Sequence, residues 1–516
     1  MQLIQVEVGG IQQYIFEGAR LREWRGASAL LDRIDRRALG QVVADEPVEV
    51  IRSGGGVAVL LVPNDAPGGT AERIEEELIG LYESEAPGAA AYATRVEGTG
   101  ESVLDLMDRL ALRAATERER VPVFDADASL LGPLVRFCDS CGRRPAEMAR
   151  TLGGEGELLC RCCHAKGRHG LRIRNGEAAG SLINRFAEHR AEHDAPGWPP
   201  ADDLPGLVPD DLEALAETDP NNDVALIQAD GNALGQTIQQ IDELDAYREF
   251  SDRVAEGVET AVFDALIDHP PRDGTLPWEV VFLGGDDVLL FTAASIALPV
   301  AEALIENVRA ETAPLTRPYD RGYLSLGLGI AAADPHVPAS VLRGLAGELE
   351  DSAKTLAYAR EEEVSTVDYH RITGEGATTL DHVREESLRP ERDYRAREDQ
   401  PPTRLTARPF TAEHLRAVRT VASAWQASEL PHGKLHRLRE SLFESPAAAR
   451  KAWAHVLARA PDDRRPAWRQ LQDLSVNGQA AGEAALPWTR AGDDSGRRET
   501  YLLDVLDARA LQPDAA

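Results

Sequence analysis

The stretch Phe282–Phe291 contains the residues best suited to chemistry. Its sequence is Phe-Leu-Gly-Gly-Asp-Asp-Val-Leu-Leu-Phe, so Asp286 and Asp287 follow two glycines and lie between two apolar runs. Such a pattern predicts a β-hairpin, because glycine tolerates the positive φ angles of a tight turn. Mg²⁺ prefers oxygen ligands and usually takes one or two carboxylates together with substrate phosphates. The hairpin therefore predicts a site for Mg²⁺ (or Mn²⁺) and a nucleoside triphosphate.

A third acid, Asp230, ends the apolar run that begins at Val224 and is followed by Gly231. This pattern predicts a buried strand with its carboxylate at the C-terminal edge. Two converging strand-end acids are typical of two-metal sites, whose ions lie roughly 4 Å apart and hold the attacking and leaving oxygens of a phosphoryl transfer. An ordinary hairpin is the alternative, because Asp-Gly and Gly-Asp pairs are common in turns. The order strand, helix, strand, turn, strand favours Asp230, Asp286 and Asp287 as catalytic residues.

All five cysteines lie in one short segment, as Cys138-x-x-Cys141 and Cys160-x-Cys162-Cys163. Two CxxC pairs separated by 18 residues are a strong zinc-ribbon pattern. We expect Cys138, Cys141, Cys160 and Cys163 to bind a structural Zn²⁺, with Cys162 as a spare that could replace one of them. Disulfides are the alternative, which the absence of a secretion signal disfavours.

The composition is strongly acidic. The chain has 56 basic and 87 acidic residues, a net charge of −31, and only four lysines. Such a composition is typical of a halophilic protein, and salt shortens the reach of charges, so the net charge does not exclude nucleic acid as a partner. With no apolar run of about twenty residues and no signal peptide, we expect a soluble, cytoplasmic protein without a membrane partner.

The pattern around the acids has a weaker copy near the N-terminus. Leu3–Glu7 resembles Leu226–Asp230, and Ser53–Leu60 resembles Gly284–Leu290. The first copy has an acid at its strand end but glycine and valine in place of the two hairpin acids. Chance similarity between short apolar strands is the alternative. We therefore expect an unequal pair of domains.

The elements after the hairpin complete a fold pattern. An amphipathic helix at about 296–312, a strand at Tyr323–Ile330 and a helix that carries Lys354 and is capped by Ser340 give the order β-α-β-β-α-β. That order predicts a ferredoxin-like palm. Farther along, Trp425, Trp453 and Trp468 at helical spacings predict a helical core. The chain is thus predicted to be α+β, with a first palm-like domain lacking the hairpin carboxylates (1–130), a zinc ribbon (131–175), a linker region (176–222), a second palm with the Gly-Gly-Asp-Asp hairpin (223–375) and a C-terminal helical domain (376–516).

These motifs together resemble one family, the large palm-domain subunit of type III CRISPR effector complexes. Gly10–Phe16 and Leu21–Ser28 are similar to the family's first palm, and the CxxC pairs occur where its zinc element lies. Asp230-Gly231 and Gly284–Asp287 match its second palm, and Ser352-Ala353-Lys354 resembles a short motif on that palm's last helix. The resemblance covers roughly residues 1–375, and the C-terminal part fits by position alone.

The resemblance implies a nucleotidyltransferase that joins ATP into cyclic oligoadenylate in antiviral defence. It implies Mg²⁺ binding by Asp230, Asp286 and Asp287, and phosphate contact by Lys354. ATP, other effector subunits and guide and target RNA are the implied partners. The implied nucleotide-binding residues are Gly231, Asn232, Gly284, Gly285 and Lys354.

Two departures from the family pattern favour an alternative. No HD nuclease motif leads the chain, so we expect no DNase activity; its one His-Asp dipeptide, His193-Asp194, opens a proline-rich stretch. Asn232 stands where a further acid would complete the metal site. The alternative is a catalytically silent subunit that binds nucleotide or RNA as a scaffold of a CRISPR effector complex.

Overall fold

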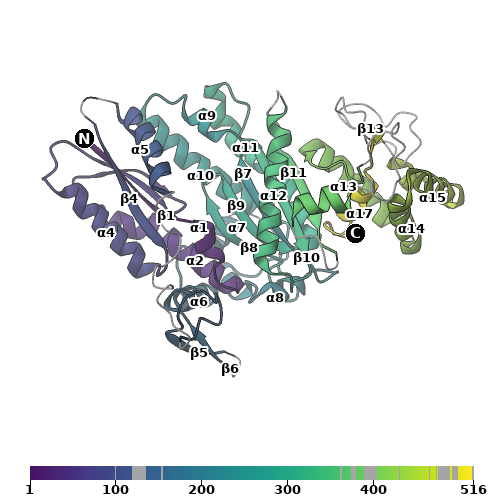
Figure 1. The fold of residues 1–516 in the computed structure, drawn as a ribbon, viewed down its shortest axis with the longest axis horizontal. Coiled ribbons are helices and arrows are strands. Elements are labelled where there is room, and N and C mark those ends of the chain that lie inside the picture. Colours follow the sequence, from purple (N-terminus) through teal and green to yellow (C-terminus); the bar gives the residue numbers. More distant parts are fainter. Residues whose placement is uncertain are drawn as a thin grey trace.

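The structure is a computed structural model with mixed α and β elements (Figure 1). The predicted boundaries near residues 130 and 376 lie outside the described residues, as does Asp194. The described residues are 1–98, 100, 102–118, 135–152, 155–193, 195–360, 363–373, 379–388, 404–428, 431–463, 465–471, 474, 489–490 and 498–513.

A six-stranded sheet forms the centre of the molecule, in the order β12-β11-β10-β7-β9-β8 (Figure 1). Strand β7 pairs antiparallel with both β9 and β10, and β10 pairs parallel with β11. The run Val224–Ile227 of β7 is fully buried, as its continuous apolar sequence predicts. The strands are β7 (Val224–Gly231), β8 (Trp278–Gly284), β9 (Asp287–Ala293), β10 (Leu326–Ala333), β11 (Thr366–Arg371) and β12 (Phe410–Thr411).

Helices cover both faces of this sheet. On one face, Ala225 and Ile227 of β7 share a core with α10 (Leu244–Ile267) and α11 (Ala297–Thr316). On the other, Val224 and Leu226 share a core with α12 (Ala339–Tyr358) and with α2, described below. The central strand is thus held from both sides.

One prediction about α12 is wrong. The N-cap of this helix is Pro338, and Ser340 lies inside the first turn. Proline has no backbone N–H and is tolerated at the start of a helix, so the helix begins at Ala339, two residues before the start that a cap at Ser340 would give. The expected strand at Tyr323–Ile330 is shifted in the opposite direction, toward the C-terminus, since β10 begins at Leu326 and ends at Ala333.

The N-terminal sheet has the strand order β2-β3-β1-β4. The corresponding strands of the central sheet follow the same order, β8-β9-β7-β10, so the similarity in sequence has a counterpart in topology. The elements are β1 (Gln2–Gly9), α1 (Ile11–Phe16), α2 (Leu21–Arg33), the π-helix η1 (Ile34–Ala38), α3 (Leu39–Val43), β2 (Glu49–Gly54), β3 (Val57–Val62), α4 (Thr70–Glu85), β4 (Ala90–Glu97) and α5 (Val103–Arg118).

Helix α2 joins three parts of the molecule. Trp24 stacks on Phe291 of β9, with ring centroids 5.5 Å apart. The Arg25 guanidinium donates hydrogen bonds of 2.7 and 3.0 Å to Glu279 of β8, and both side chains are buried. A Cβ on Gly26 would lie 1.9 Å from a carbonyl oxygen of α6 (Arg161–Arg174), so the two helices cross in backbone contact.

The segment 176–222, which we expected to be a linker, is partly helical. It contains α7 (Leu182–Ala191), the 3₁₀-helix η3 (Ala201–Leu207) and α8 (Leu212–Ala216). Phe186 of α7 contacts Trp278 of the central sheet in a T-shaped arrangement, with ring centroids 4.7 Å apart. This packing onto β8 explains why the segment is ordered despite its prolines and aspartates.

The C-terminal region is mainly helical and continues the central sheet through β12. Trp468 contacts Trp425 and Trp453, with ring centroids 5.1 and 5.9 Å apart, which confirms the predicted aromatic core. No helix in the described part of the chain is long and apolar enough to cross a membrane. The elements are the π-helix η6 (His382–Ser387), α13 (Ala412–Ala427), α14 (His432–Glu444), α15 (Pro446–Arg459), α16 (Arg465–Gln470), β13 (Thr489–Arg490), β14 (Arg498–Glu499) and α17 (Leu502–Ala508).

The buried Arg25–Glu279 pair gives a first testable prediction. Arg25→Ala leaves the Glu279 carboxylate buried without its partner, so we expect the free energy of unfolding to fall by about 3 kcal/mol. The matched control is Arg73→Ala, which breaks the more exposed Arg73–Glu46 pair and should cost about 1 kcal/mol or less. Denaturant unfolding measures both, and equal losses would contradict a coupling role for Arg25.

Candidate functional site

The central sheet brings the three predicted acids together. Strands β8 and β9 form a hairpin in which Gly284 pairs with Asp287, leaving Gly285 and Asp286 as the turn. Gly285 has a φ of 73°, which a residue with a side chain rarely adopts. Ala229 of β7 pairs with Val288 of β9, so the next antiparallel position sets Asp230 beside Asp287.

The carboxylates repel one another. Desolvation and then the charge of Asp230 raise the pKa of Asp286 to about 6. The same two causes, followed by the charge of Asp286, raise the pKa of Asp287 to about 8, although Asp287 is exposed and solvent screens part of this repulsion. The three residues do not form a set of oxygens all within 4.8 Å of one another. Asp230 interacts with both hairpin acids and is the centre of the group.

Lys354 supplies the opposite charge. From α12 its ammonium group contacts Asp230 Oδ2 and lies 2.7 Å from Glu350 Oε1. Desolvation opposes the charge, but hydrogen bonds to these two carboxylates raise the pKa of Lys354 above its ordinary value. Glu350 also accepts a hydrogen bond of 2.8 Å from Gln228 of β7. Lys354 is therefore part of the acidic cluster and stays charged.

Gly231 and Asn232 line the same place. A Cβ on Gly231 would lie 2.5 Å from Asp286 Oδ2, so glycine lets the hairpin acid approach β7. Asn232 is buried, and its Nδ2 lies 3.2 Å from Ser325 Oγ. Its Oδ1 is buried and has no hydrogen-bond partner among the described residues. Buried polar atoms normally have partners, so an unpaired oxygen here indicates room for a ligand group.

The hairpin of the N-terminal sheet meets the Gly-Gly-Asp-Asp hairpin. A Cβ on Gly55 would lie 3.7 Å from Gly284 Cα, so the two glycine turns lie nearly in contact. Arg52 of β2 is close enough for its charge to lower the pKa of Asp286, against the larger effects that raise it. Of the two predicted nucleotide-binding glycines, Gly284 is therefore packed against Gly55 and Phe282, whereas a Cβ on Gly285 would have open space around it.

Sequence reasoning missed Glu350, Arg52 and Ser325. The spacing of Glu350 four residues before Lys354 on one helix was a usable signal, because such residues lie on the same face. Arg52 and Ser325 have no local signal, since tertiary contacts alone bring them to the acids.

The residues present fit a divalent cation. Carboxylate oxygens are the ligands that Mg²⁺ prefers, and the cluster adds the unpaired amide oxygen of Asn232. A bound cation would also offset the repulsion that raises the pKa values of Asp286 and Asp287.

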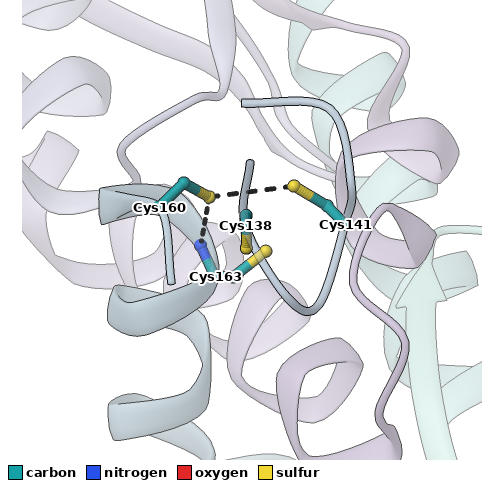
Figure 2. Close-up of side chains that lie close together, drawn as sticks. All are labelled: Cys138, Cys141, Cys160 and Cys163. Atoms are coloured by element: carbon teal, nitrogen blue, oxygen red, sulfur yellow. Dashed lines mark hydrogen bonds between the residues drawn. The ribbon is translucent and has the colours of Figure 1, made fainter. Parts of the chain in front are cut away.

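A second candidate site is formed by cysteines. Figure 2 shows the side chains of Cys138, Cys141, Cys160 and Cys163 gathered around one point, and their sulfurs all lie within 4.8 Å of one another. The Cys141 and Cys160 sulfurs are 3.9 Å apart, close to the roughly 3.8 Å expected across a tetrahedral site with Zn–S bonds of about 2.3 Å. All five cysteines are free of disulfides. The four residues fit a structural Zn²⁺.

The local fold prepares the cysteines for this role. Cys160 is the N-cap of α6, and its sulfur accepts a hydrogen bond of 3.3 Å from the Cys163 amide (Figure 2). Cys138 and Cys141 lie on the loop before a hairpin of β5 (Met148–Leu152) and β6 (Glu155–Leu159). Cys162 points elsewhere, with its sulfur 3.7 Å from Glu17 Oε2, so it lies outside the four-sulfur cluster.

This geometry predicts how the cysteines differ. We expect Cys163→Ser to lose bound zinc and to unfold at a lower temperature, because a structural Zn²⁺ contributes directly to folding. Cys162→Ser is the matched control and should retain one zinc per chain. Elemental analysis after gel filtration measures the zinc content of both variants. If Cys162→Ser lost its zinc and Cys163→Ser kept it, the assignment would be contradicted.

The raised pKa of Asp287 predicts a pH-dependent stability. The folded pKa of about 8 lies above the ordinary value of 3.8, so the folded protein binds more protons between these values and loses stability as the pH rises. We therefore expect Asp287→Asn to unfold about 2–4 °C above the wild type near pH 8, in buffer without divalent cations.

The difference should shrink as the pH falls toward about 4, where the carboxyl is protonated in the folded state and about half protonated in the unfolded state. Asp245→Asn removes an exposed acid on α10 and serves as control, with a difference that stays small at both pH values. If the unfolding temperatures of Asp287→Asn and the wild type differed by the same amount near pH 4 and pH 8, the proposed repulsion at Asp287 would be contradicted.

Comparisons with known proteins agree with this geometry. Residues 223–361 match the family model described as Cas10/Cmr2, second palm domain. The matched segment includes the three acids and Lys354. A comparison with curated proteins gave no match.

Solved structures of similar fold include Csm1 in T. onnurineus, with 12% identity, a TM-score of 0.52 and coverage of 99% of this chain and 70% of that chain. A Csm1–Csm4 cassette in complex with cA3 has 14% identity, a TM-score of 0.50 and the same two coverages. A cassette in complex with cA4 has 15% identity and a TM-score of 0.45; the match covers 69% of this chain and 53% of that chain.

At these identities the structural similarity concerns the fold, whereas the family model concerns the sequence of the central segment. Together they confirm the resemblance expected from the motifs. Residues 223–361 match the Cas10/Cmr2 second palm domain family model, and the chain is similar in fold to Csm1, as the resemblance to the large palm-domain subunit of type III CRISPR effector complexes implies.

Proposed function

We propose that the chain is a Mg²⁺-dependent nucleotidyltransferase that joins ATP into cyclic oligoadenylate as a subunit of a type III CRISPR effector. The observation that carries this proposal is the convergence of Asp230 with Asp286 and Asp287 inside the family-matched segment. A Csm1–Csm4 cassette of similar fold was solved with cA3, which supports the product class.

The proposal includes the finer organisation of the chain. The two sheets with the same strand order would be two palms, and the first would lack the hairpin acids. The predicted domain boundaries at residues 130, 175, 222 and 375 belong to this proposal. ATP, other effector subunits and guide and target RNA are the proposed partners.

The proposed reaction is a phosphoryl transfer between two nucleotides. The 3′-hydroxyl oxygen of one ATP forms a bond to the α-phosphorus of another, the bond to the β-phosphate oxygen breaks, pyrophosphate leaves and the hydroxyl proton passes to solvent. Mg²⁺, when bound by the three aspartates, would make the hydroxyl more acidic and offset charge on the phosphates.

The protein's own residues would position the reactants. Asp230 is fixed on the buried strand β7, whereas Asp286 and Asp287 are held by the hairpin turn. Gly285 leaves the backbone of the turn accessible to a nucleotide, and the unpaired Asn232 Oδ1 is a ready acceptor. Lys354 would give up its contact with Asp230 and bind a phosphate oxygen. Asp230 would then be free to bind the cation.

The direct test is product formation in high salt with Mg²⁺ or Mn²⁺ and ATP, with the protein alone and with effector subunits and target RNA. We expect pyrophosphate release and oligoadenylate, and a loss of about 100-fold or more in Asp286→Ala/Asp287→Ala. Asp245→Ala, which removes an exposed acid in the first turn of α10, is the matched control and should remain active.

Two outcomes would contradict the proposal. One is unchanged product from the double variant, and the other is no product under either condition. Nucleotide binding without pyrophosphate release would instead support the silent scaffold subunit.

A further inference from the structure

A cluster of two histidines and one aspartate lies apart from both sites described above. His189 is near the C-terminal end of α7, His193 follows two residues after that helix, and Asp264 faces them from α10. His189 Nε2 lies 2.7 Å and His193 Nε2 lies 3.9 Å from Asp264 Oδ1. One ligand atom from each of the three residues lies within 4.8 Å of the others.

The backbone around this cluster is fixed by other contacts. One turn earlier on α7, Arg185 donates hydrogen bonds of 2.8 and 3.0 Å to Glu259 of α10. The His189 ring also packs against Phe263, with ring centroids 5.6 Å apart. Both the spacing of the helices and the orientation of His189 are therefore set before any ligand binds, as precise metal sites require.

The hydrogen bonds of His193 leave a lone pair directed at a carboxylate. Its Nδ1 lies 2.9 Å from the carbonyl oxygen of His189, and a carbonyl can only accept, so Nδ1 carries the proton. In the neutral ring, Nε2 is then an acceptor that faces Asp264, which is also an acceptor. A cation between them would satisfy both groups. A backbone carbonyl holding the other ring nitrogen is typical of histidines that bind metals.

We propose that His189, His193 and Asp264 bind a divalent transition metal ion such as Zn²⁺ or Co²⁺. Metal–nitrogen bonds of about 2.0 Å place tetrahedral ligands about 3.3 Å apart, and the separation of 3.9 Å between His193 Nε2 and Asp264 Oδ1 is near that value. The contact of 2.7 Å between His189 Nε2 and Asp264 Oδ1 is a hydrogen bond, which the metal would replace as the Nε2 proton is released. Imidazole nitrogens select such metals over Mg²⁺ and Ca²⁺. The His193 side chain is 45% exposed, so water can complete the coordination.

The bound metal would clamp α7 to α10. Helix α7 follows the cysteine-containing segment in the chain, and α10 covers the central sheet, so the clamp would tie these two parts together near the surface. The site is independent of the proposed nucleotidyltransfer, since none of its three residues belongs to the aspartate cluster.

Co²⁺ binding to the full chain, with its cysteine site already filled by zinc, tests the proposal. Because the aspartate cluster would also take up Co²⁺, the count is made in the Asp286→Ala/Asp287→Ala protein, where we expect one additional Co²⁺ per chain by equilibrium dialysis, with visible absorption of a nitrogen- and oxygen-bound ion. His193→Ala should weaken this binding about tenfold or more while leaving the fold intact, because the residue is largely exposed. Asp264→Asn should act in the same direction.

The matched control is His436→Ala, which removes an exposed histidine that faces a single carboxylate, Glu440, at 3.1 Å. It should leave Co²⁺ binding unchanged. The hairpin acids are absent from every protein compared, which separates the test from that of the nucleotide site. No additional Co²⁺, or equal affinity with and without His193→Ala, would overturn the proposal.

Discussion

The structure depends on holding like charges together at the end of one strand. Asp230 and Asp287 lie side by side across β7 and β9, and Asp286 follows at the turn, although like charges in such positions destabilise a sheet. The sheet tolerates this because β7 is buried on both faces and its register cannot slip without moving apolar side chains out of the core. Lys354 offsets part of the repulsion. The repulsion between the carboxylates thus remains at the place where a cation and phosphates would bind.

Helix α2 connects the acidic hairpin to the rest of the fold. Trp24 and Arg25 fix the helix to β9 and β8, the two strands of the acidic hairpin, while Gly26 brings it into contact with the cysteine-bearing α6. Two of the few lysines lie at the acidic hairpin and at the cysteine cluster. The chain has only four lysines, and one is Lys354 at the acids while another, Lys166, is fully buried over the Tyr14 ring beside the cysteine cluster.

Local patterns predicted the acids and the cysteines because both depend on short sequence spacing. A glycine turn between apolar runs and paired CxxC motifs determine which side chains meet, and the structure brings both groups together. Arg52 was missed because packing between distant segments brings it to the site, whereas Glu350 had a local signal in its spacing of four residues from Lys354. The helices of 176–222 were missed because contacts such as Phe186 with Trp278 outweigh local propensity.

Proton release on Mn²⁺ binding tests the central claim most directly, namely that the repelling aspartates form a cation site. Without metal, desolvation and the charges of Asp230 and Asp286 raise the pKa of Asp287 to about 8, so Asp287 carries a proton in part of the molecules near pH 7. Calorimetry in buffers of different ionisation enthalpy should therefore detect protons released as Mn²⁺ binds, and Asp286→Asn/Asp287→Asn should abolish both binding and release. Mn²⁺ binding of equal strength in the double variant, or binding without proton release in the wild type, would contradict the account.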